Sequence, residues 1–299
     1  MPNATALRRP AALAAAAVAL AAGAYACGTD STAPGLRRVY GAPVALGAGH
    51  ARSYVVLDDA PGGAPAEFGV ALDEAALENL PAPMPMPAGT DPHAHADSHE
   101  YLLPLPAENP TQYKLVELDW NPGGHEPPGI YDVPHFDFHF YKITKAERDA
   151  IDPAVTGGDG YAAKSAAMPA AAQVPAAYVP LAAPGTAPVA VPHMGVHWSD
   201  VHSPELQGAL GHPELAKPFT TTFIHGAWDG QFIFDEPMVT RAFILGRKAA
   251  AAAAQRDSVV PLAASAAYAA PGYHPASYHV QYDAATKEYR VALGLARHD

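Results

Sequence analysis

The chain has 299 residues, of which 30 are acidic and 18 are basic, and its formal net charge is −12. This charge argues against a nucleic-acid partner, because phosphates require a basic protein surface. A single cysteine cannot form an internal disulfide. The 32 prolines break helices and cannot donate to a β-ladder, so we expect short elements joined by ordered turns.

The start of the chain has the pattern of an export signal. Arg8 and Arg9 form a positive segment, and residues 11–26 are a small, apolar run that ends in an Ala-x-Ala cleavage pattern. The run is shorter than the roughly 20 residues that a membrane span requires. We therefore predict a signal peptide over residues 1–26 and an exported protein. Removal of its two arginines takes the net charge from −12 to −14.

Cys27 follows this run directly and is the only cysteine. Its position resembles the lipidated cysteine of bacterial lipoproteins, which predicts a periplasmic or outer-surface protein held by an acyl chain. The alternative is a plain cleavage site, which leaves a secreted protein that begins at Cys27. In both cases the acidity disfavours contact with anionic lipid except through such an anchor.

After a predicted tether at residues 27–39, we expect a single β-rich domain over residues 40–299. Apolar or alternating segments bounded by turn residues predict strands. These segments are residues 53–57, 67–72, 101–103, 114–120, 134–141, 219–224, 231–234, 238–245, 277–282 and 288–295. Asp229-Gly230 predicts a hairpin turn. The expected fold is mainly β, an antiparallel β-sandwich or a jelly-roll-like barrel.

Only a few short helices are expected. Residues 73–79 and 144–150 have capping patterns, with a capping box in the second segment. The alanine-rich segment 248–257 is the strongest helix candidate, because alanine is the best helix former. Residues 153–192 are rich in Ala and Pro and carry few charges, which predicts a long loop over the surface of the domain.

Residues 134–141, with the sequence PHFDFHFY, carry the strongest functional signal. Their side chains alternate with the period of two of a β-strand. Phe136, Phe138 and Phe140 are therefore predicted to face the core, and a slip of one residue would expose them, so the register is strongly specified. The side chains on the other face are the metal-ligand types His135, Asp137 and His139. The same slip would bury Asp137.

Strand geometry limits which of these side chains share an ion. At roughly 3.3 Å per residue, His135 and His139 lie about 13 Å apart at Cα and cannot both bind one ion in a regular strand. Side chains two residues apart are separated by about 6–7 Å, which permits chelation. Asp137 with His139, or His135 with Asp137, is then the feasible pair. We favour Asp137 with His139, because these two lie deeper in the strand.

A second histidine unit offers further ligands. Residues 192–198, PHMGVHW, place His193 and His197 four apart, and a helical turn there would bring both onto one face. Glu236, at the end of a predicted strand, would complete the coordination sphere, and His125 in the turn before the main strand is a further candidate. Zn²⁺ suits these mixed nitrogen and oxygen ligands best, with Cu²⁺, Ni²⁺, Mn²⁺ and Fe²⁺ as alternatives.

Other interpretations of these histidines stay open. Paired histidines can stabilise a fold by hydrogen bonds to carboxylates and carbonyls without any metal. Asp137 can orient a ligand histidine instead of binding an ion. His93, His95 and His99 form either a surface metal tract or a solvated loop.

Motifs of other chemistries are missing from the sequence, which has no Gly-x-Ser-x-Gly elbow, phosphate loop, dinucleotide fingerprint or His-Glu-x-x-His helix. The segments GGHEPPG (123–129), PHFDFHFY (134–141), PHMGVHW (192–198) and FDEPM (234–238) resemble a bacterial family of exported proteins classed as a domain of unknown function. The resemblance spans roughly residues 40–296. It implies a β-rich, exported protein and carries no activity.

These patterns together predict an exported metal-binding protein, whose wider role stays open between envelope stress and metal handling. The alternative is a metal-dependent enzyme, a hydrolase or non-haem oxygenase, with Glu236, Glu126 or His135 as proton-transfer group. A closed four-ligand sphere would favour binding, and three ligands facing an aromatic pocket would favour catalysis. A structural surface protein is a third hypothesis, and the sequence leaves homo-oligomer formation open.

Overall fold

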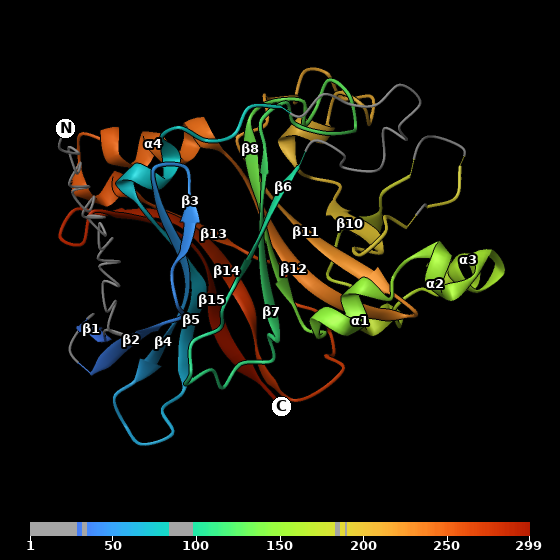
Figure 1. Cartoon of the computed structure of the whole chain (residues 1–299). Coiled ribbons are helices and arrows are strands. Elements are labelled where there is room, and N and C mark those ends of the chain that lie inside the picture. The colour runs from blue at the N-terminus through green and yellow to red at the C-terminus, as the bar shows by residue number, and fades with distance from the viewer. Residues whose placement is uncertain (1–28, 32–34, 84–97, 183–185, 189) are drawn as a thin grey trace, which may run out of the picture.

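The computed structural model describes residues 29–31, 35–83, 98–182, 186–188 and 190–299 (Figure 1). The predicted signal peptide, Cys27, His93 and His95 lie outside these residues. Two antiparallel sheets pack face to face, and the described strands close no barrel. The predicted antiparallel β-sandwich is therefore confirmed, and the barrel alternative is not.

Sheet A is formed by the first and last parts of the described chain. Its strand order is β1-β2-β4-β5-β15-β14-β13, with β3 paired to β4. The bounds are β1 Thr29–Ser31, β2 Leu36–Tyr40, β3 Val44–Leu46, β4 Gly49–Asp58, β5 Pro65–Asp73, β13 Asp257–Pro261, β14 Gly272–Asp283 and β15 Glu288–His298. Because β15 pairs with β5, this sheet ties the end of the chain to its first strands.

Sheet B is formed by the middle of the chain, in the order β6-β7-β8-β12-β11-β10-β9. The bounds are β6 His99–Leu103, β7 Leu115–Asn121, β8 His135–Tyr141, β9 Tyr178–Pro180, β10 Val196–Asp200, β11 Thr221–Trp228 and β12 Gln231–Thr240. Asp229 and Gly230 join β11 to β12 with φ angles of 50° and 78°. Positive φ at both positions is what a tight hairpin turn requires, so the predicted hairpin is confirmed.

An apolar core fills the space between the sheets. Phe136, Phe138 and Phe140 of β8 point into it and are fully buried. The ring of Phe68 on β5 lies 5.6 Å from that of Phe140, measured between centroids. Full burial of such a side chain contributes about 1.5–3 kcal/mol to folding. The predicted direction of the three phenylalanines is therefore confirmed.

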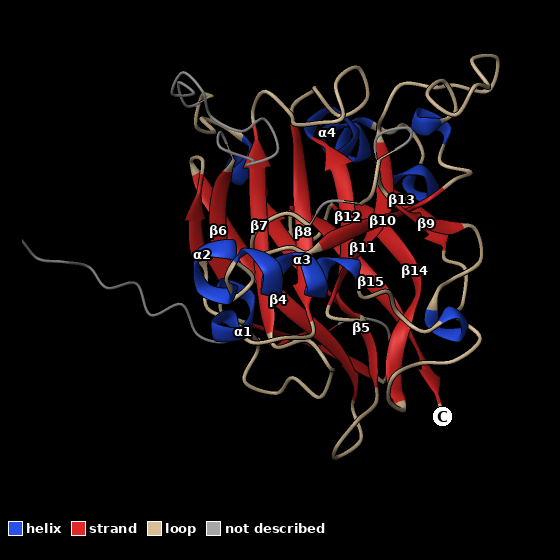
Figure 2. Cartoon of the chain, turned by 90° about the vertical axis from the view of Figure 1, so that its right-hand side faces the viewer, coloured by secondary structure: helices blue, strands red, loops and turns tan. Residues whose placement is uncertain are grey.

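Short helices connect the strands. The bounds are α1 Lys145–Asp149, α2 Pro153–Thr156, α3 Gly158–Ala166 and α4 Arg241–Ala249, with 3-10 turns at Glu74–Leu77, Ala171–Gln173, Pro204–Leu206 and Ala253–Arg256. The predicted capping box of Thr144 and Glu147 starts α1. Helices α1 to α3 lie on the outer side of sheet B (Figure 2). In the described chain, no helix is long and apolar enough to cross a membrane.

The predicted strand at residues 238–245 is correct only as far as Thr240, and the predicted helix at residues 248–257 is wrong in its position, since α4 ends at Ala249 and only a 3-10 turn, Ala253–Arg256, follows. Strand β12 ends at Thr240, whose hydroxyl accepts a hydrogen bond from a backbone N–H in the first turn of α4. The helix forms there because Ile244 becomes fully buried. The alanine run further on is exposed, and helix propensity alone rarely stabilises a helix without such packing.

Two other predicted boundaries also differ from the structure. Residues 29–31 and 36–39 of the predicted tether form β1 and most of β2, since Val39 packs into the core and anchors this part of the sheet. The predicted loop at residues 153–192 contains α2, α3 and β9. Strand β9 forms at the edge of sheet B because Tyr178 buries its ring in the core.

Candidate metal centre

The face of sheet B that points away from sheet A carries a layer of polar side chains. Strand pairing places Asp119 opposite Asp137 and Glu117 opposite His139, across β7 and β8. Strand β12 pairs with β8 on its other side. We call the following eight residues the polar layer: Glu117, Asp119, Asn121, His135, Asp137, His139, His197 and Glu236. Figure 2 views the molecule from this side.

Seven of the eight residues of the polar layer are buried and His197 is half-buried, although the layer faces away from the main core. His135, Asp137 and His139 each expose 1% of their surface or less. A second apolar cluster covers part of the layer and consists of Tyr131, Leu206, Phe219, Ile224 and Met238. The expectation that only a slip in register would bury Asp137 is therefore wrong, because the loops that precede β8 and β11 close over this face. The outer face of sheet B is a second, polar interior.

His139, His197 and Glu236 form the first ligand group. One ligand atom from each residue lies within 4.8 Å of the other two. Nε2 of His139 is 3.5 Å from Oε1 of Glu236, and its Nδ1 is 3.2 Å from Oδ2 of Asp119. A carboxylate at one ring nitrogen orients a ligand histidine and leaves the other nitrogen for the ion. The three ligands come from β8, β10 and β12, which are far apart in sequence.

His125, His135 and Asp137 form the second ligand group, whose ligand atoms also lie within 4.8 Å of one another. Nε2 of His135 is 3.1 Å from Oδ1 of Asp137, and Nε2 of His125 is 3.2 Å from Oδ2. Asn121 donates a hydrogen bond of 2.7 Å to the same Oδ2. The two ligand groups share no residue, and each contains two imidazoles and one carboxylate.

A third set, of Glu117, Asp119 and His139, satisfies the same distance limit. Arg148 of α1 donates a hydrogen bond of 2.6 Å to Glu117, however, and ties one of its oxygens to a cation of the protein itself. Asp119 faces the nitrogen of His139 that points away from Glu236. We therefore interpret this set as the support that orients His139, and not as an ion site.

Several ligand atoms of the polar layer have no hydrogen-bond partner in the described part of the chain. They are Oε2 of Glu117, both carboxylate oxygens of Asp119, Nε2 of His135, Oδ1 of Asp137, both ring nitrogens of His139 and Oε2 of Glu236. The contacts of His139 with Asp119 and Glu236, and of His135 with Asp137, are short but lack the angles of a hydrogen bond. Each unsatisfied buried group costs about 1–3 kcal/mol, and charged groups cost more. A cation bound among them would remove this cost.

Burial raises the proton affinity of three carboxylates in the layer. Desolvation raises the pKa of Glu236 to about 8. Desolvation, together with the charge of Asp119, raises the pKa of Glu117 to about 8. Desolvation and the neighbouring acids also raise the pKa of Asp119 well above its usual value. These carboxylates therefore lack enough positive charge from the protein itself.

Asp137 and His197 show the opposite electrostatic effect. Burial alone would raise the pKa of Asp137, but His135 and His125 hold it well below its usual range. Desolvation lowers the pKa of His197 to about 3. His197 is thus neutral at pH 7, which is the form of imidazole that binds metal ions.

Five of the six predicted ligands lie in the two ligand groups: His135, Asp137, His139, His197 and Glu236. The favoured pair, Asp137 with His139, is split between them. His139 approaches Glu236 on β12, whereas Asp137 approaches His125 in the loop before β8. Partners on neighbouring segments therefore decide the grouping, rather than the spacing along β8.

His193 does not join either group of described residues. It lies in the turn before β10 with φ 68°, where its N–H donates to the carbonyl of Ile151 and its own carbonyl accepts from Tyr141. The predicted helical turn does not form, because β10 is extended and carries His197 away from His193. His99, from the predicted loop tract, has its ring nitrogen 3.0 Å from the carbonyl oxygen of Ala82.

Sequence reasoning missed the contribution of β7 and α1. The segment 114–120 alternates with the same period as β8, and this signal was sufficient to place Glu117 and Asp119 on one face. Arg148 gave no sequence signal, since its contact with Glu117 depends on how α1 folds back onto the sheet. His125 was a candidate without a defined partner, and the structure places it against Asp137.

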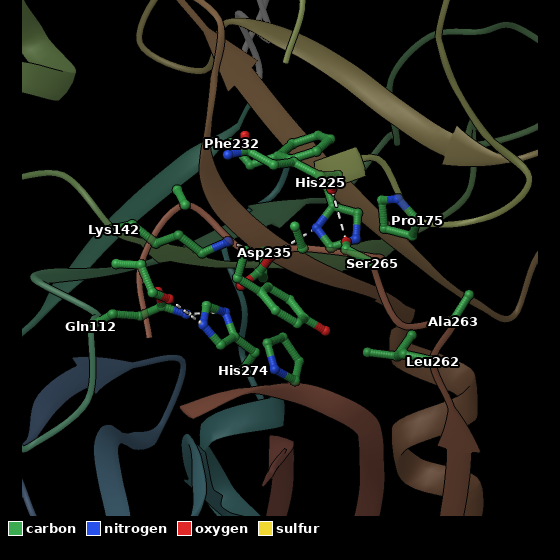
Figure 3. A pocket seen from close by; sticks show the side chains of 16 residues that line it. Gln112, Lys142, Pro175, His225, Phe232, Asp235, Leu262, Ala263, Ser265 and His274 are labelled. Atoms are coloured by element: carbon green, nitrogen blue, oxygen red, sulfur yellow. Dashed lines mark hydrogen bonds and ion pairs between the residues drawn. The ribbon is translucent and has the colours of Figure 1, made fainter. Parts of the chain in front are cut away.

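A separate polar network surrounds Asp235, on the opposite face of β12 from Glu236. Asp235 accepts hydrogen bonds from the hydroxyl of Tyr113 (2.6 Å), the ammonium of Lys142 (3.0 Å) and Nδ1 of His225 (2.7 Å). Figure 3 shows Lys142 and His225 on opposite sides of this carboxylate, at a cavity of about 180 Å³. The protein's own donors satisfy Asp235, so this network has no need of an ion.

One comparison with known proteins gave a match. The model of the TTHB210-like family, described as hypothetical protein TTHB210, matches residues 62–120. This segment runs from β5 to β7 and ends before the motif segments, the first of which begins at residue 123. A search of curated proteins and a search of solved structures each found no match. Over residues 62–120 the chain is therefore similar to a family of uncharacterised proteins, which supports a domain of unknown function.

Proposed function

We propose that this chain is a metal-binding protein that holds a divalent transition-metal ion with His139, His197 and Glu236. The observation that carries this proposal is the convergence of three ligand side chains inside a buried layer. Nε2 of His139 and Oε2 of Glu236 have no hydrogen-bond partner among the described residues. A bound cation supplies the missing partner to both.

The spacing of the first ligand group fits an ion of the size of Zn²⁺. Ligand atoms at about 2.0–2.2 Å from a tetrahedral ion lie about 3.3–3.6 Å apart. His139 Nε2 and Glu236 Oε1 are 3.5 Å apart, so they need little movement to share an ion. Two imidazoles and one carboxylate favour zinc, with copper, nickel, manganese or iron as alternatives.

A bound ion would link β8, β12 and β10 across sheet B. Strand β11 lies between β12 and β10 in the sheet, so the ion would bridge strands that are not direct neighbours. Binding to the folded state only would stabilise the fold by mass action. We therefore expect the ion to fasten β10 to β8 and β12 as well as to be carried by the protein.

A metal-dependent enzyme is the second candidate, because three protein ligands leave coordination positions for water and substrate. Two histidines and one carboxylate bind the metal in many catalytic zinc and non-haem iron sites. His139 and Glu236 are almost completely buried, which restricts the access of a substrate to the ion. Metal binding without catalysis is therefore the function that the geometry favours.

Elemental analysis of the purified protein, after removal of metal by chelation and reconstitution with Zn²⁺, tests this proposal. We expect His139→Ala and Glu236→Gln to lose the ion of the first ligand group while far-UV circular dichroism stays unchanged. His193→Ala is the matched control, since it alters the other histidine of the same motif and leaves both groups intact. Less than about a tenth of an equivalent of metal in the reconstituted wild type would contradict the proposal.

We further propose, from the sequence, that the chain is exported and processed before Cys27. Export would place the metal site in the cell envelope, where metal handling and envelope stress are the roles to examine. Intact mass spectrometry of the protein made in a bacterial host distinguishes a chain starting at an acylated Cys27 from one starting at a plain cysteine. A mass that includes residues 1–26 would contradict cleavage before Cys27, whether or not the cysteine is acylated.

A further inference from the structure

His125 and His135 each have one ring nitrogen fixed by a backbone carbonyl. Nδ1 of His125 lies 2.7 Å from the carbonyl oxygen of Glu126, and Nδ1 of His135 lies 2.7 Å from that of Val133. A carbonyl oxygen only accepts hydrogen bonds, so both Nδ1 atoms must carry the proton. In its neutral form, each ring would then present the lone pair of its Nε2 atom.

Both of these Nε2 atoms point at the same carboxylate. They lie 3.2 Å and 3.1 Å from the two oxygens of Asp137, for His125 and His135 respectively. The contact of His125 has the geometry of a hydrogen bond, whereas that of His135 does not. If both rings were neutral, the lone pairs of both nitrogens would face carboxylate oxygens and repel them. In the described chain, Nε2 of His135 and Oδ1 of Asp137 have no hydrogen-bond partner, and both atoms are buried. A positive charge must therefore lie among the three side chains.

We infer that the protein binds a second divalent metal ion in a site of its own, formed by His125, His135 and Asp137. This inference rests on the proposed function of the first ligand group and extends it to a centre of two ions. A histidine whose other nitrogen donates to a backbone carbonyl is the usual arrangement in metal sites. Asn121 helps to orient the carboxylate of Asp137 by its hydrogen bond to Oδ2.

The second ion is distinct from the first, because the two ligand groups have no residue in common. Asp137 and His139 are separated by two positions of a regular strand, about 6–7 Å at Cα. The carboxylate of Asp137 is directed toward His125 and His135, whereas Nε2 of His139 is directed toward Glu236. The two sites are therefore neighbours in one polar layer and can be emptied separately.

Two protons are the competing source of positive charge, since imidazolium rings at both histidines would also pair with Asp137. That state places two buried cations beside one carboxylate and uses no metal. The number of ions bound per chain separates the two states. Metal should be stripped with a chelator and the protein reloaded with Zn²⁺, separated from free metal by gel filtration, and analysed for zinc per chain.

We expect two zinc ions per wild-type chain and one in either His125→Gln or Asp137→Asn. Glu236→Gln should also bind one ion, and Asp137→Asn combined with Glu236→Gln should bind none. The matched control is His225→Gln, which alters a histidine bound to a carboxylate outside the polar layer and should leave two ions. Circular dichroism checks that each variant is folded. If Asp137→Asn, which alters a buried residue, does not fold, His125→Gln still tests the second site.

One zinc ion in the wild type, lost in Glu236→Gln and kept in His125→Gln, would overturn the second site and leave the proposed function intact. Two ions that persist in both His125→Gln and Asp137→Asn would also overturn it, because the second ion would then bind elsewhere. No zinc in the wild type would remove the proposed function together with this inference.

Discussion

Asp235 and Glu236 are consecutive and almost completely buried residues of β12, and their surroundings are opposite. Asp235 faces the space between the sheets and accepts hydrogen bonds from Tyr113, Lys142 and His225. Burial alone would raise the pKa of Asp235, but Lys142 and His225 hold it below its usual range. Glu236 faces the polar layer, where desolvation raises its pKa to about 8.

The difference between these two carboxylates lies in the number of donors and not in burial. A buried carboxylate is stable when its lone pairs are matched by donors or cations. The fold supplies Asp235 with three donors, one of which is a lysine. It leaves Oε2 of Glu236 without a hydrogen bond from any described residue. Counting donors around each buried acid therefore separates a structural network from a ligand site.

The largest effect is expected for Asp235→Ala. The change leaves Lys142, His225 and the hydroxyl of Tyr113 without their acceptor, and breaking a buried ion pair costs about 3–5 kcal/mol. Urea unfolding should show this loss of stability to the same extent with and without a chelator. If the loss of stability disappeared in the presence of the chelator, Asp235 would stabilise the fold only by supporting metal binding. The contrast between Asp235 and Glu236 would then not hold.

Removal of metal should have the next largest effect. Free metal at 100 times the Kd stabilises a folded protein by about 2.7 kcal/mol, so a chelator should lower the melting temperature. In Glu236→Gln the response should shrink, and in the chelator this variant should be as stable as wild type or more so, because it no longer buries an unpaired acid. An unchanged melting curve of wild type in the chelator would favour histidines that serve only a structural role.

Substitution of Glu288 on sheet A should have a smaller effect on stability, and this effect should depend on pH. Glu288 accepts hydrogen bonds from Arg52 (2.5 Å) and Arg290 (2.9 Å). Burial alone would raise its pKa, but the two arginines lower it. The folded carboxyl thus binds protons less tightly than the unfolded one, and its contribution is present above pH 4.5 and lost as the pH falls through the folded value.

Glu288→Gln should accordingly lower the free energy of unfolding by about 2 kcal/mol at pH 7, as expected for hydrogen bonds to a charged group. The difference between wild type and Glu288→Gln should shrink as the pH falls below 4.5. Denaturant titrations of both proteins at several pH values would measure this. A difference that does not change with pH would show that the glutamate stabilises the fold by packing alone.

The period of two in residues 134–141 was enough to predict which way each side chain of β8 points. It could not predict that both faces are buried, because Phe219 and Tyr131 reach the outer face from irregular loops. The same limit explains His125, which meets Asp137 only because of the path of the loop before β8. His193 is the reverse case. Its spacing in the motif predicted a metal ligand, but in the structure its backbone N–H and carbonyl make the hydrogen bonds that hold the turn before β10.

An anomalous-difference map from a crystal of the zinc-loaded protein, recorded on both sides of the zinc edge, tests metal binding in the polar layer most directly. We expect one peak at about 2.0–2.2 Å from ligand atoms of His139, His197 and Glu236. A second peak should lie at bonding distance from His125, His135 and Asp137. Absence of both peaks, with the imidazoles hydrogen-bonded directly to Glu236 and Asp137, would contradict a metal centre in this layer.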